Sequence, residues 1–272
     1  MTIKGKEENA MELADAVNVL GNFCGMRDLR ALTPPALEDQ YNIRQADAMV
    51  LFGGAILAGG DILAQAIRQG MAKKYIIVGG AGHTTPVLRQ KMHALFPDLQ
   101  TDAMPEAALF NCYLQRKYGL SADYLETEST NCGNNITFLL ALMERQKIAC
   151  GSVILCQDST MQRRMGAVLR RYRPDMTIIH YAAYQAEVVE TENGLQYAAQ
   201  INGMWELSRY IELLLGEISR LTDDENGYGP KGKGYIVHVD IPEDVRSAFR
   251  TLSARYAVRQ ADPRFASEQR GL

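Results

Sequence analysis

Two apolar runs that each end in a pair of glycines constrain the fold of this chain more than any other feature. They lie at residues 49–54 (MVLFGG) and 75–80 (YIIVGG). Since neither run alternates with polar residues, each is typical of a strand buried on both faces of a parallel sheet. Glycine at a strand end lets the chain turn and lets backbone N–H groups approach a ligand. Ligands of open α/β sheets bind beyond the carboxyl ends of the strands, so these corners predict the position of a site.

From residue 46 onward, strand-like runs alternate with helical stretches. Strands are predicted at residues 48–53, 74–79, 123–127, 152–157 and 176–181. Helices are predicted between them at residues 61–70, 86–96, 105–118, 133–146 and 159–172. Strands that alternate with helices of this length imply right-handed crossovers and a mostly parallel sheet of about five strands.

Helical segments are expected before and after this alternation. Residues 10–24 place Leu13, Val17 and Leu20 on one stripe, as in an amphipathic helix. Later segments are predicted as a helix at 204–220, a glycine-rich loop at 222–234, a β-prone run at 235–241 and a helix at 242–259. We therefore expect an N-terminal helical extension (1–45), an α/β core (46–184) and a C-terminal helical segment that packs on the core (185–272).

Composition excludes several function classes. With 29 Lys and Arg against 32 Asp and Glu, the chain lacks the basic surplus of a general nucleic-acid binder. No apolar stretch reaches the roughly 20 residues of a membrane-spanning helix, and the first residues lack a secretory apolar core. Five cysteines without paired spacing predict reduced thiols in a cytoplasmic protein. Four scattered histidines predict no metal site.

The glycine corners do not match two common nucleotide motifs. Residues 54–61 have the glycine spacing of a P-loop, but Gly60 and Asp61 stand where that loop needs Lys and Ser or Thr. The G-x-G-x-x-G motif and the acidic residue of NAD dehydrogenases are absent as well. Two alternatives remain open: the corners bind an anion through backbone amides, or their glycines only permit tight helix–sheet packing.

The predicted strand at 123–127 is followed by the polar segment ETESTNCGNN (126–135). One such residue suffices to cap the next helix. Because several small polar residues surround a glycine here, we expect Thr130, Asn131 and Asn134 to contact a ligand.

The strand at 152–157 is followed by a polar cap and two arginines. Asp158 or Ser159 is expected to cap the next helix, and Arg163 and Arg164 come one turn later. At least one arginine should face the sheet edge, where its planar guanidinium suits a carboxylate or phosphate. The alternative is a solvated charge on a basic helix.

Two further side chains and one loop are candidates for the same edge. Glu106 follows Pro105 in the first turn of a helix, where a carboxylate suits the helix dipole or acts as an acceptor or base. His83 lies in a flexible loop after the second strand. The loop at 222–234 either closes over the site or only connects its neighbours. No Ser/His/Asp arrangement and no G-x-S-x-G motif is present.

At these residues the chain resembles the SanA/ElyC/YdcF family, most closely its YdcF branch, over residues 10 to about 250. The matching segments are GGAGHTT (79–85), PEA (105–107), STNCGN (129–134), QDSTMQRR (157–164), DDENGYGPKG (223–232) and IVHVDIP (236–242). The resemblance implies a three-layer Rossmann-like sandwich and S-adenosylmethionine binding, whereas anchored relatives are linked to envelope or peptidoglycan-precursor metabolism. Many members have a histidine where this chain has Met161, three residues before Arg164. Acid–base chemistry by that histidine is therefore not expected.

We expect a cytoplasmic Rossmann-like protein that binds a small adenosyl or nucleotide-like metabolite, with S-adenosylmethionine as the candidate. The alternatives are a transferase or hydrolase acting on a phosphorylated or envelope-related precursor, and an assembly module that uses the C-terminal helices. Candidate acid–base residues are Glu106, His83 and Asp158. Candidate binding residues are Gly53, Gly54, Gly79, Gly80, Glu106, Thr130, Asn131, Asn134, Gln157, Asp158, Arg163 and Arg164.

Overall fold

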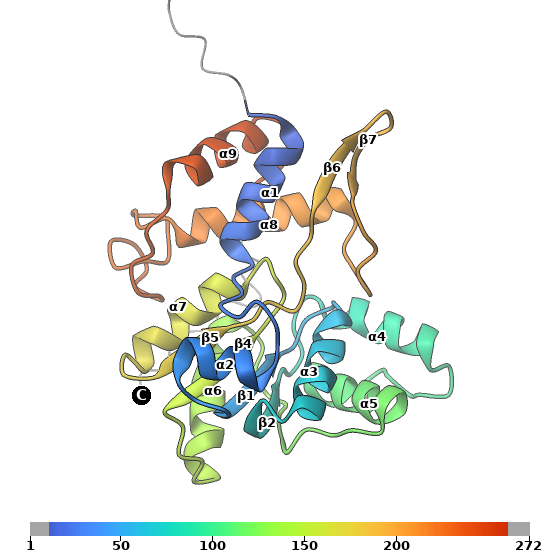
Figure 1. The fold of residues 1–272 in the computed structure, drawn as a ribbon. Coiled ribbons are helices and arrows are strands. Elements are labelled where there is room, and N and C mark those ends of the chain that lie inside the picture. The colour runs from blue at the N-terminus through green and yellow to red at the C-terminus, as the bar shows by residue number, and fades with distance from the viewer. Residues whose placement is uncertain (1–10, 261–272) are drawn as a thin grey trace, which may run out of the picture.

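A five-stranded parallel sheet forms the centre of the computed structural model, which describes residues 11–260 (Figure 1). Its strand order is β3-β2-β1-β4-β5. The apolar parts of the three middle strands, at residues 48–52, 76–78 and 153–156, are almost entirely inaccessible to solvent, as unbroken apolar runs predict. The predicted α/β class and parallel sheet are confirmed. The strands are β1 (Ala46–Phe52), β2 (Ala72–Val78), β3 (Tyr124–Glu126), β4 (Ser152–Cys156) and β5 (Thr177–His180).

The strand order reverses at β1. The chain builds β1, β2 and β3 outward in one direction and then returns to place β4 on the other side of β1. β1 consequently pairs with β2 along one edge and with β4 along the other. This is the order of a Rossmann-like sheet, in which ligands bind between the carboxyl ends of the strands at the switch point. Here the switch point lies between β1 and β4.

Helices cover both faces of the sheet, because right-handed crossovers change face when the winding direction reverses. α3 and α5 pack together on one side, and α6 and α7 pack together on the other (Figure 1). Gly70 and Gly119, which end α3 and α5, have φ angles of 64° and 68°, in the left-handed region that favours glycine. These helices are α3 (Ala58–Gln69), α4 (Thr85–Leu95), α5 (Glu106–Tyr118), α6 (Cys132–Arg145) and α7 (Gln162–Tyr172).

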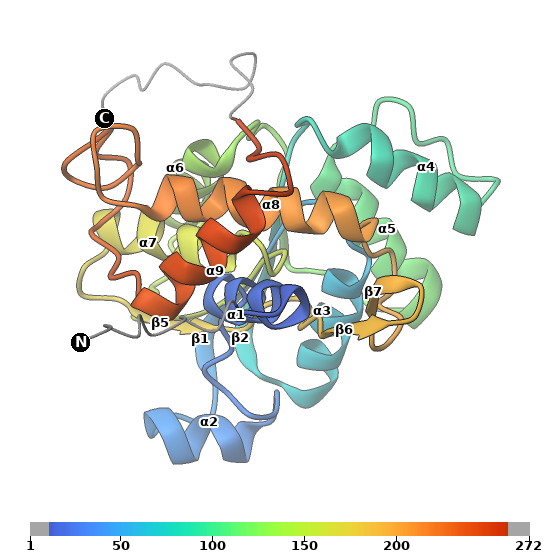
Figure 2. The same ribbon diagram turned by 90° about the horizontal axis from the view of Figure 1, so that it is seen from above.

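Segments from the two ends of the sequence form one further layer, which we call the cap. It comprises α1 (Leu13–Cys24), α8 (Leu207–Leu221), α9 (Glu243–Ser253), the loop at 222–242 and the tail at 254–260. α1 packs against both α8 and α9, and the three helices lie together over the core in both ribbon views (Figures 1 and 2). The N-terminal and C-terminal additions are therefore not separate, since each completes the apolar face of the other. The remaining helix, α2 (Pro34–Tyr41), leads into β1.

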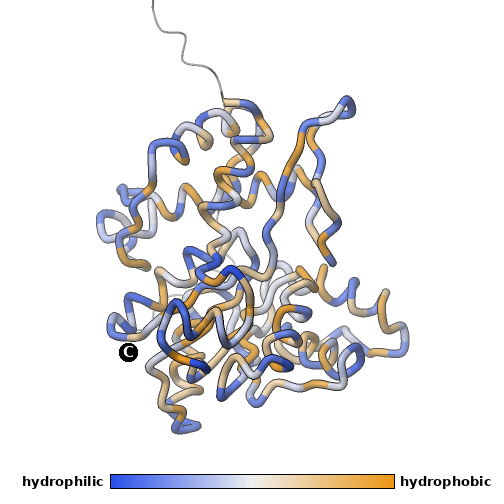
Figure 3. The backbone as a smooth tube through the Cα atoms, in the orientation of Figure 1, coloured by the Kyte–Doolittle hydropathy of each residue, from blue (hydrophilic) through white to orange (hydrophobic). Residues whose placement is uncertain are grey.

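The structure differs from the sequence prediction after residue 184. A hairpin of β6 (Val188–Thr191) and β7 (Gly194–Tyr197) was not expected, and its turn is hydrophilic (Figure 3). The β-prone run at 235–241 is not a strand, because the N–H groups of its first two residues both donate to the carbonyl of Tyr228 instead of a neighbouring strand. The last helix ends at Ser253, not near residue 259, and the chain beyond it runs to the cavity described below.

The remaining global features concern cysteines, metals and membranes. All five cysteines are free, and burial raises the pKa of the Cys156 thiol to about 12. Among residues 11–260, no three His, Cys, Asp or Glu side chains are grouped so that they could hold a metal ion. The same part of the chain contains no helix with the length and apolar character needed to cross a membrane.

Candidate functional site

A cavity of about 270 Å³ lies between the carboxyl edge of the sheet and the cap. Its floor comes from the ends of β1, β2 and β4 and from the starts of α5, α6 and α7. Its opposite wall comes from α8, from the loop that follows α8 and from the tail. The cavity therefore lies at the switch point of the sheet, where the strand order predicts a ligand.

Three of the four predicted glycines line the cavity: Gly53, Gly54 and Gly79. A side chain at Gly53 would collide with the carboxylate of Glu106, whereas one at Gly54 would meet only Gln157 Oε1 at 3.8 Å. Gly80 does not line the cavity, because it packs against residues 127–129 and donates its N–H to the carbonyl of Ser129 at 2.9 Å. The packing alternative therefore applies to Gly80, while the other three bring backbone to the cavity surface.

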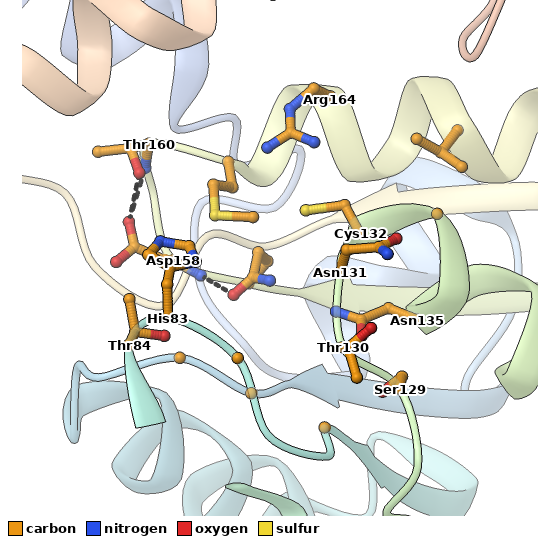
Figure 4. Close-up of a pocket in the computed structure, with 18 of the residues that line it drawn as sticks. His83, Thr84, Ser129, Thr130, Asn131, Cys132, Asn135, Asp158, Thr160 and Arg164 are labelled. Carbon is orange, nitrogen blue, oxygen red and sulfur yellow. Dashed lines mark hydrogen bonds between the residues drawn. The ribbon is translucent and has the colours of Figure 1, made fainter. Parts of the chain in front are cut away.

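The start of α6 supplies a polar edge to the cavity. Asn131 caps this helix, since its Oδ1 accepts from the N–H of Asn134 at 3.0 Å. Thr130 and Asn131 line the cavity, as predicted. The prediction for Asn134 is wrong, because its Oδ1 accepts hydrogen bonds from these two side chains and the residue does not line the cavity. Asn135, rather than Asn134, lies on the cavity wall (Figure 4). Capping and cavity lining are thus combined in Asn131.

Glu106, the first residue of α5, is a carboxylate with one oxygen available to a ligand. Its side chain lies on the cavity surface, and the residue is only 7% exposed. Oε1 accepts from the hydroxyls of Thr84 at 3.1 Å and Thr85 at 2.8 Å. No residue among 11–260 donates to Oε2. Burial raises the pKa of Glu106 despite these two hydrogen bonds, which favours a proton on the carboxyl group. Glu106 can therefore donate or accept a proton at the cavity surface.

Asp158 is held by donors from three parts of the chain. Its Oδ1 accepts from the N–H and the hydroxyl of Thr160 and from the hydroxyl of Tyr184, at 2.8–2.9 Å. Its Oδ2 accepts from the indole of Trp205 at 3.0 Å. These bonds tie the end of β4 to the segments that follow β5 and β7. The geometry suits Asp158 for positioning the cavity wall more than for accepting a proton.

Gln157 precedes Asp158 and presents a free amide. Its Oε1 accepts from the N–H of Asp158 at 2.6 Å. In the described part of the chain, nothing accepts from its Nε2, although the residue is only 1% exposed and lines the cavity. Since this amide has no acceptor among residues 11–260 and its residue lines the cavity, it is available for a hydrogen bond to a ligand or water.

His83 lies on the exposed loop after β2 and lines the cavity. The guanidinium of Arg259 donates to its Nε2 at 2.8 Å. This contact joins the core to the tail of the cap across the cavity. Figure 4 shows His83 and Thr84 on the opposite side from Arg164.

The two adjacent arginines of α7 point in different directions. Arg164 lines the cavity and forms an ion pair with Glu217 of α8, with Nη2 to Oε1 at 2.9 Å. Figure 4 shows its guanidinium group pointing toward the start of α6. Arg163 turns away, donates to the carbonyl of Phe23 at 2.6 Å and stacks on the ring of that residue. The helix rotation thus places only Arg164 at the predicted anion site.

Several cavity residues were missed by sequence reasoning. The cap adds three cations and two tyrosine rings from segments far from the strand ends. One signal was available, because Glu217 interrupts the apolar stripe of α8 and a carboxylate there needs a buried cation. The tail offered no comparable signal. The missed residues include Arg220, Lys233, Arg259, Tyr172, Trp205, Tyr228 and Tyr235.

Comparison with known proteins adds little to this geometry. No family model matches the chain. Among solved structures, the crystal structure of the Escherichia coli tRNA N6-threonylcarbamoyladenosine dehydratase TcdA is similar to it. The two share 11% sequence identity over 81% of this chain and 92% of that chain, with a TM-score of 0.32. The fold assignment accordingly depends on the strand order, and the site depends on its own residues.

Proposed function

We propose that this protein binds a small adenosyl or nucleotide-like metabolite in the switch-point cavity. One observation carries the proposal: two nearly buried groups, Glu106 Oε2 and Gln157 Nε2, lack a partner among residues 11–260 and lie on the surface of the same cavity. An acceptor and a donor in this arrangement suit the hydroxyl and amino groups of a nucleoside. Water alone would satisfy them without requiring a cavity of this size.

Other cavity residues suit the remaining parts of such a ligand. Tyr235 is the most exposed aromatic side chain at the cavity, and it packs edge-on against Tyr228. A nucleobase would stack on these rings. Arg164 would hold an anionic group, as proposed for a guanidinium at a strand edge. The glycine backbone at Gly53 and Gly54 would lie against the ribose.

S-adenosylmethionine is the specific candidate that we propose to test first. Its support comes from the resemblance of residues 79–85 and 157–164 to the YdcF branch. The methyltransferase signature, an acidic residue followed by Gly-x-Gly-x-Gly after the first strand, is missing from this chain. A different binding mode, with the amino-acid carboxylate at Arg164, is therefore part of the proposal.

Calorimetric titration of the full chain with adenosine and with S-adenosylmethionine tests the proposal. We expect saturable heat with at least one of them and a roughly tenfold weaker affinity in Glu106→Gln, about 1.4 kcal/mol. Asn134→Ser is the matched control, because Asn134 lies beside the cavity without lining it. Native mass spectrometry of freshly purified protein would reveal a retained ligand. Absence of heat with both compounds and of any retained nucleoside would refute the proposal.

The second candidate function is catalysis on a phosphorylated or envelope-related precursor, by group transfer or hydrolysis. Glu106 favours it, because burial raises the pKa of this cavity carboxyl toward the range useful for proton transfer. A metabolite extract incubated with the protein should then yield a product that disappears with Glu106→Gln. A product that persists in that variant would reject Glu106 as the acid or base, and no product at all would reject catalysis.

A further inference from the structure

Two guanidinium groups contact a single carboxylate beside the cavity, and a third lies near enough to influence it. Arg164 and Arg220 both contact Glu217, with the closest Arg220 nitrogen 3.4 Å from Oε1. Arg220 also donates to the carbonyl of Arg259. Arg164 and Arg220 are each 7% exposed and Glu217 is 1% exposed, so water screens these charges poorly. We call Arg164, Arg220, Arg259 and Lys233 the cationic wall, since all four line the cavity.

The cationic wall carries more positive charge than residues 11–260 neutralise. The three arginines lower the pKa of Glu217, so this carboxylate is ionised. Burial together with the charges of Arg220, Arg209 and Arg164 lowers the pKa of Arg259, while Glu217 opposes the change. Arg209 has its own partner in Glu212. Because Arg164 and Arg220 are nearly buried, this excess of cations indicates that an anion completes the site.

The start of α6 faces this wall and offers donors of its own. In the part of the chain that the structure describes, nothing accepts from the backbone N–H groups of Cys132 and Gly133. Both residues line the cavity, and the only atom within 4 Å of a Cβ added at Gly133 would be Asn131 Oδ1, at 3.3 Å. The guanidinium of Arg164 also retains Nη1, which has no acceptor among residues 11–260. Helix N–H groups opposite a guanidinium form a common phosphate site in proteins.

We propose that the cationic wall and the start of α6 bind a phosphate group, so that the ligand is a nucleoside phosphate. This inference rests on the proposed function, because it adds a phosphate subsite to the nucleoside cavity. A terminal phosphate brings about two negative charges at neutral pH and several acceptor oxygens. S-adenosylmethionine brings one carboxylate together with an ammonium and a sulfonium group, so it neutralises the wall less well. The charge of the wall therefore favours the phosphorylated ligand over S-adenosylmethionine.

Calorimetry on the full chain with adenosine, ADP, pyrophosphate and S-adenosylmethionine tests the inference. We expect ADP to bind at least about tenfold more tightly than adenosine and S-adenosylmethionine, equivalent to one charge-assisted contact. Raising the salt concentration should weaken ADP binding and leave adenosine binding unchanged, since salt screens the exposed Lys233 of the wall and adenosine carries no charge.

Substitutions in the cationic wall test which residues bind the phosphate group. Lys233→Gln and Arg259→Gln should each lower the affinity for ADP by about three- to tenfold and leave the affinity for adenosine unchanged. Lys231→Gln is the matched control, because Lys231 lies in the same loop but does not line the cavity. Arg259→Lys should recover part of the affinity if charge is what matters. Circular dichroism of each variant separates loss of binding from loss of folding.

The outcomes distinguish this inference from the proposed function. Equal affinities for adenosine and ADP would overturn the phosphate subsite and leave nucleoside binding intact. Tighter binding of S-adenosylmethionine than of ADP would overturn it as well. Pyrophosphate binding that is sensitive to Lys233→Gln, without binding of any nucleoside, would support the subsite and reject the proposed function. No heat with any of the four compounds would reject both.

Discussion

The floor and the cap side of the cavity differ in charge: carboxyl groups lie on the floor, and cations are in excess on the cap side. On the floor, Glu106 accepts from two hydroxyl groups and Asp158 accepts from four donors, so both carboxyl groups have hydrogen-bond partners in the protein. On the cap side, Glu217 contacts Arg220 and also Arg164 of α7, and the nearby Arg259 helps to lower the pKa of the same carboxylate. Among residues 11–260, the floor leaves a few neutral polar groups without a partner, whereas the cap side retains unbalanced positive charge. This polarity would orient a ligand with its anionic end toward the cap.

The two sides also differ in how they are assembled. The floor consists of short segments that directly follow strands, so the parallel sheet aligns them at one edge. The cap consists of α8, a loop and a tail, which meet only because α1 and α9 pack beside α8. The comparison indicates that the floor depends on the sheet and the cap on side-chain contacts between helices. The following predictions test this difference.

Glu217→Gln should have the largest effect on stability. Removing this carboxylate leaves Arg164 and Arg220 buried without a counter-charge, which costs about 3–5 kcal/mol. Urea unfolding followed by circular dichroism measures the change. Glu212→Gln is the control, because its pair with Arg209 on the same helix is partly exposed and is worth less than about 0.5 kcal/mol. Equal effects of the two substitutions would contradict the account of the cap.

Gly53→Ala should disturb the floor by an intermediate amount. The new methyl group would collide with Glu106 and displace its carboxylate, at a cost of about 1–3 kcal/mol. The adjacent Gly54→Ala should be tolerated, since its nearest neighbour would be Gln157 Oε1 at 3.8 Å. Thermal unfolding compares the two variants. The account of this corner fails if Gly54→Ala is the more damaging of the pair.

Glu106 should give stability a specific dependence on pH. Its folded pKa lies above the ordinary value of 4.5, so between these two values the folded state binds more protons than the unfolded state. The free energy of unfolding therefore falls as pH rises through this interval and levels off above the folded pKa. Glu106→Gln lacks this contribution, so its stability relative to the wild type should increase over the same interval. Parallel pH profiles for the two proteins would show that the carboxyl is not perturbed.

The loop at 222–234 should show the smallest effect. His238 lies between the carboxylates of Asp223 and Asp240, at 2.6 and 2.9 Å, and these contacts raise its pKa. The stabilisation of the loop is complete below the ordinary value of 6.5 and is lost as pH rises through the folded pKa. Tryptic cleavage after Lys231 or Lys233 should accordingly accelerate with pH in the wild type more than in His238→Gln. The same assay with ADP tests whether the loop closes over a ligand, since a lid would become protected.

Much of the floor could be predicted because its signals are local. Uninterrupted apolar runs with terminal glycines specify buried parallel strands, and parallel strands bring their exits together. Gly53, Gly79, Asn131 and Gln157 could be placed at one edge from these facts alone. Local patterns could not separate Gly79 from Gly80, because both follow the same strand and only the packing of residues 127–129 distinguishes them.

Sequence alone determined the Rossmann-like sheet and the edge at which the cavity lies, because alternating strands and helices admit few chain paths. The tertiary structure decided which arginine faces the cavity, that α1 joins the C-terminal helices, and that Arg220, Lys233 and Arg259 form one wall. These outcomes depend on the rotation and packing of helices that are distant in the chain. Side chains become neighbours there through surface complementarity, which residue spacing does not encode.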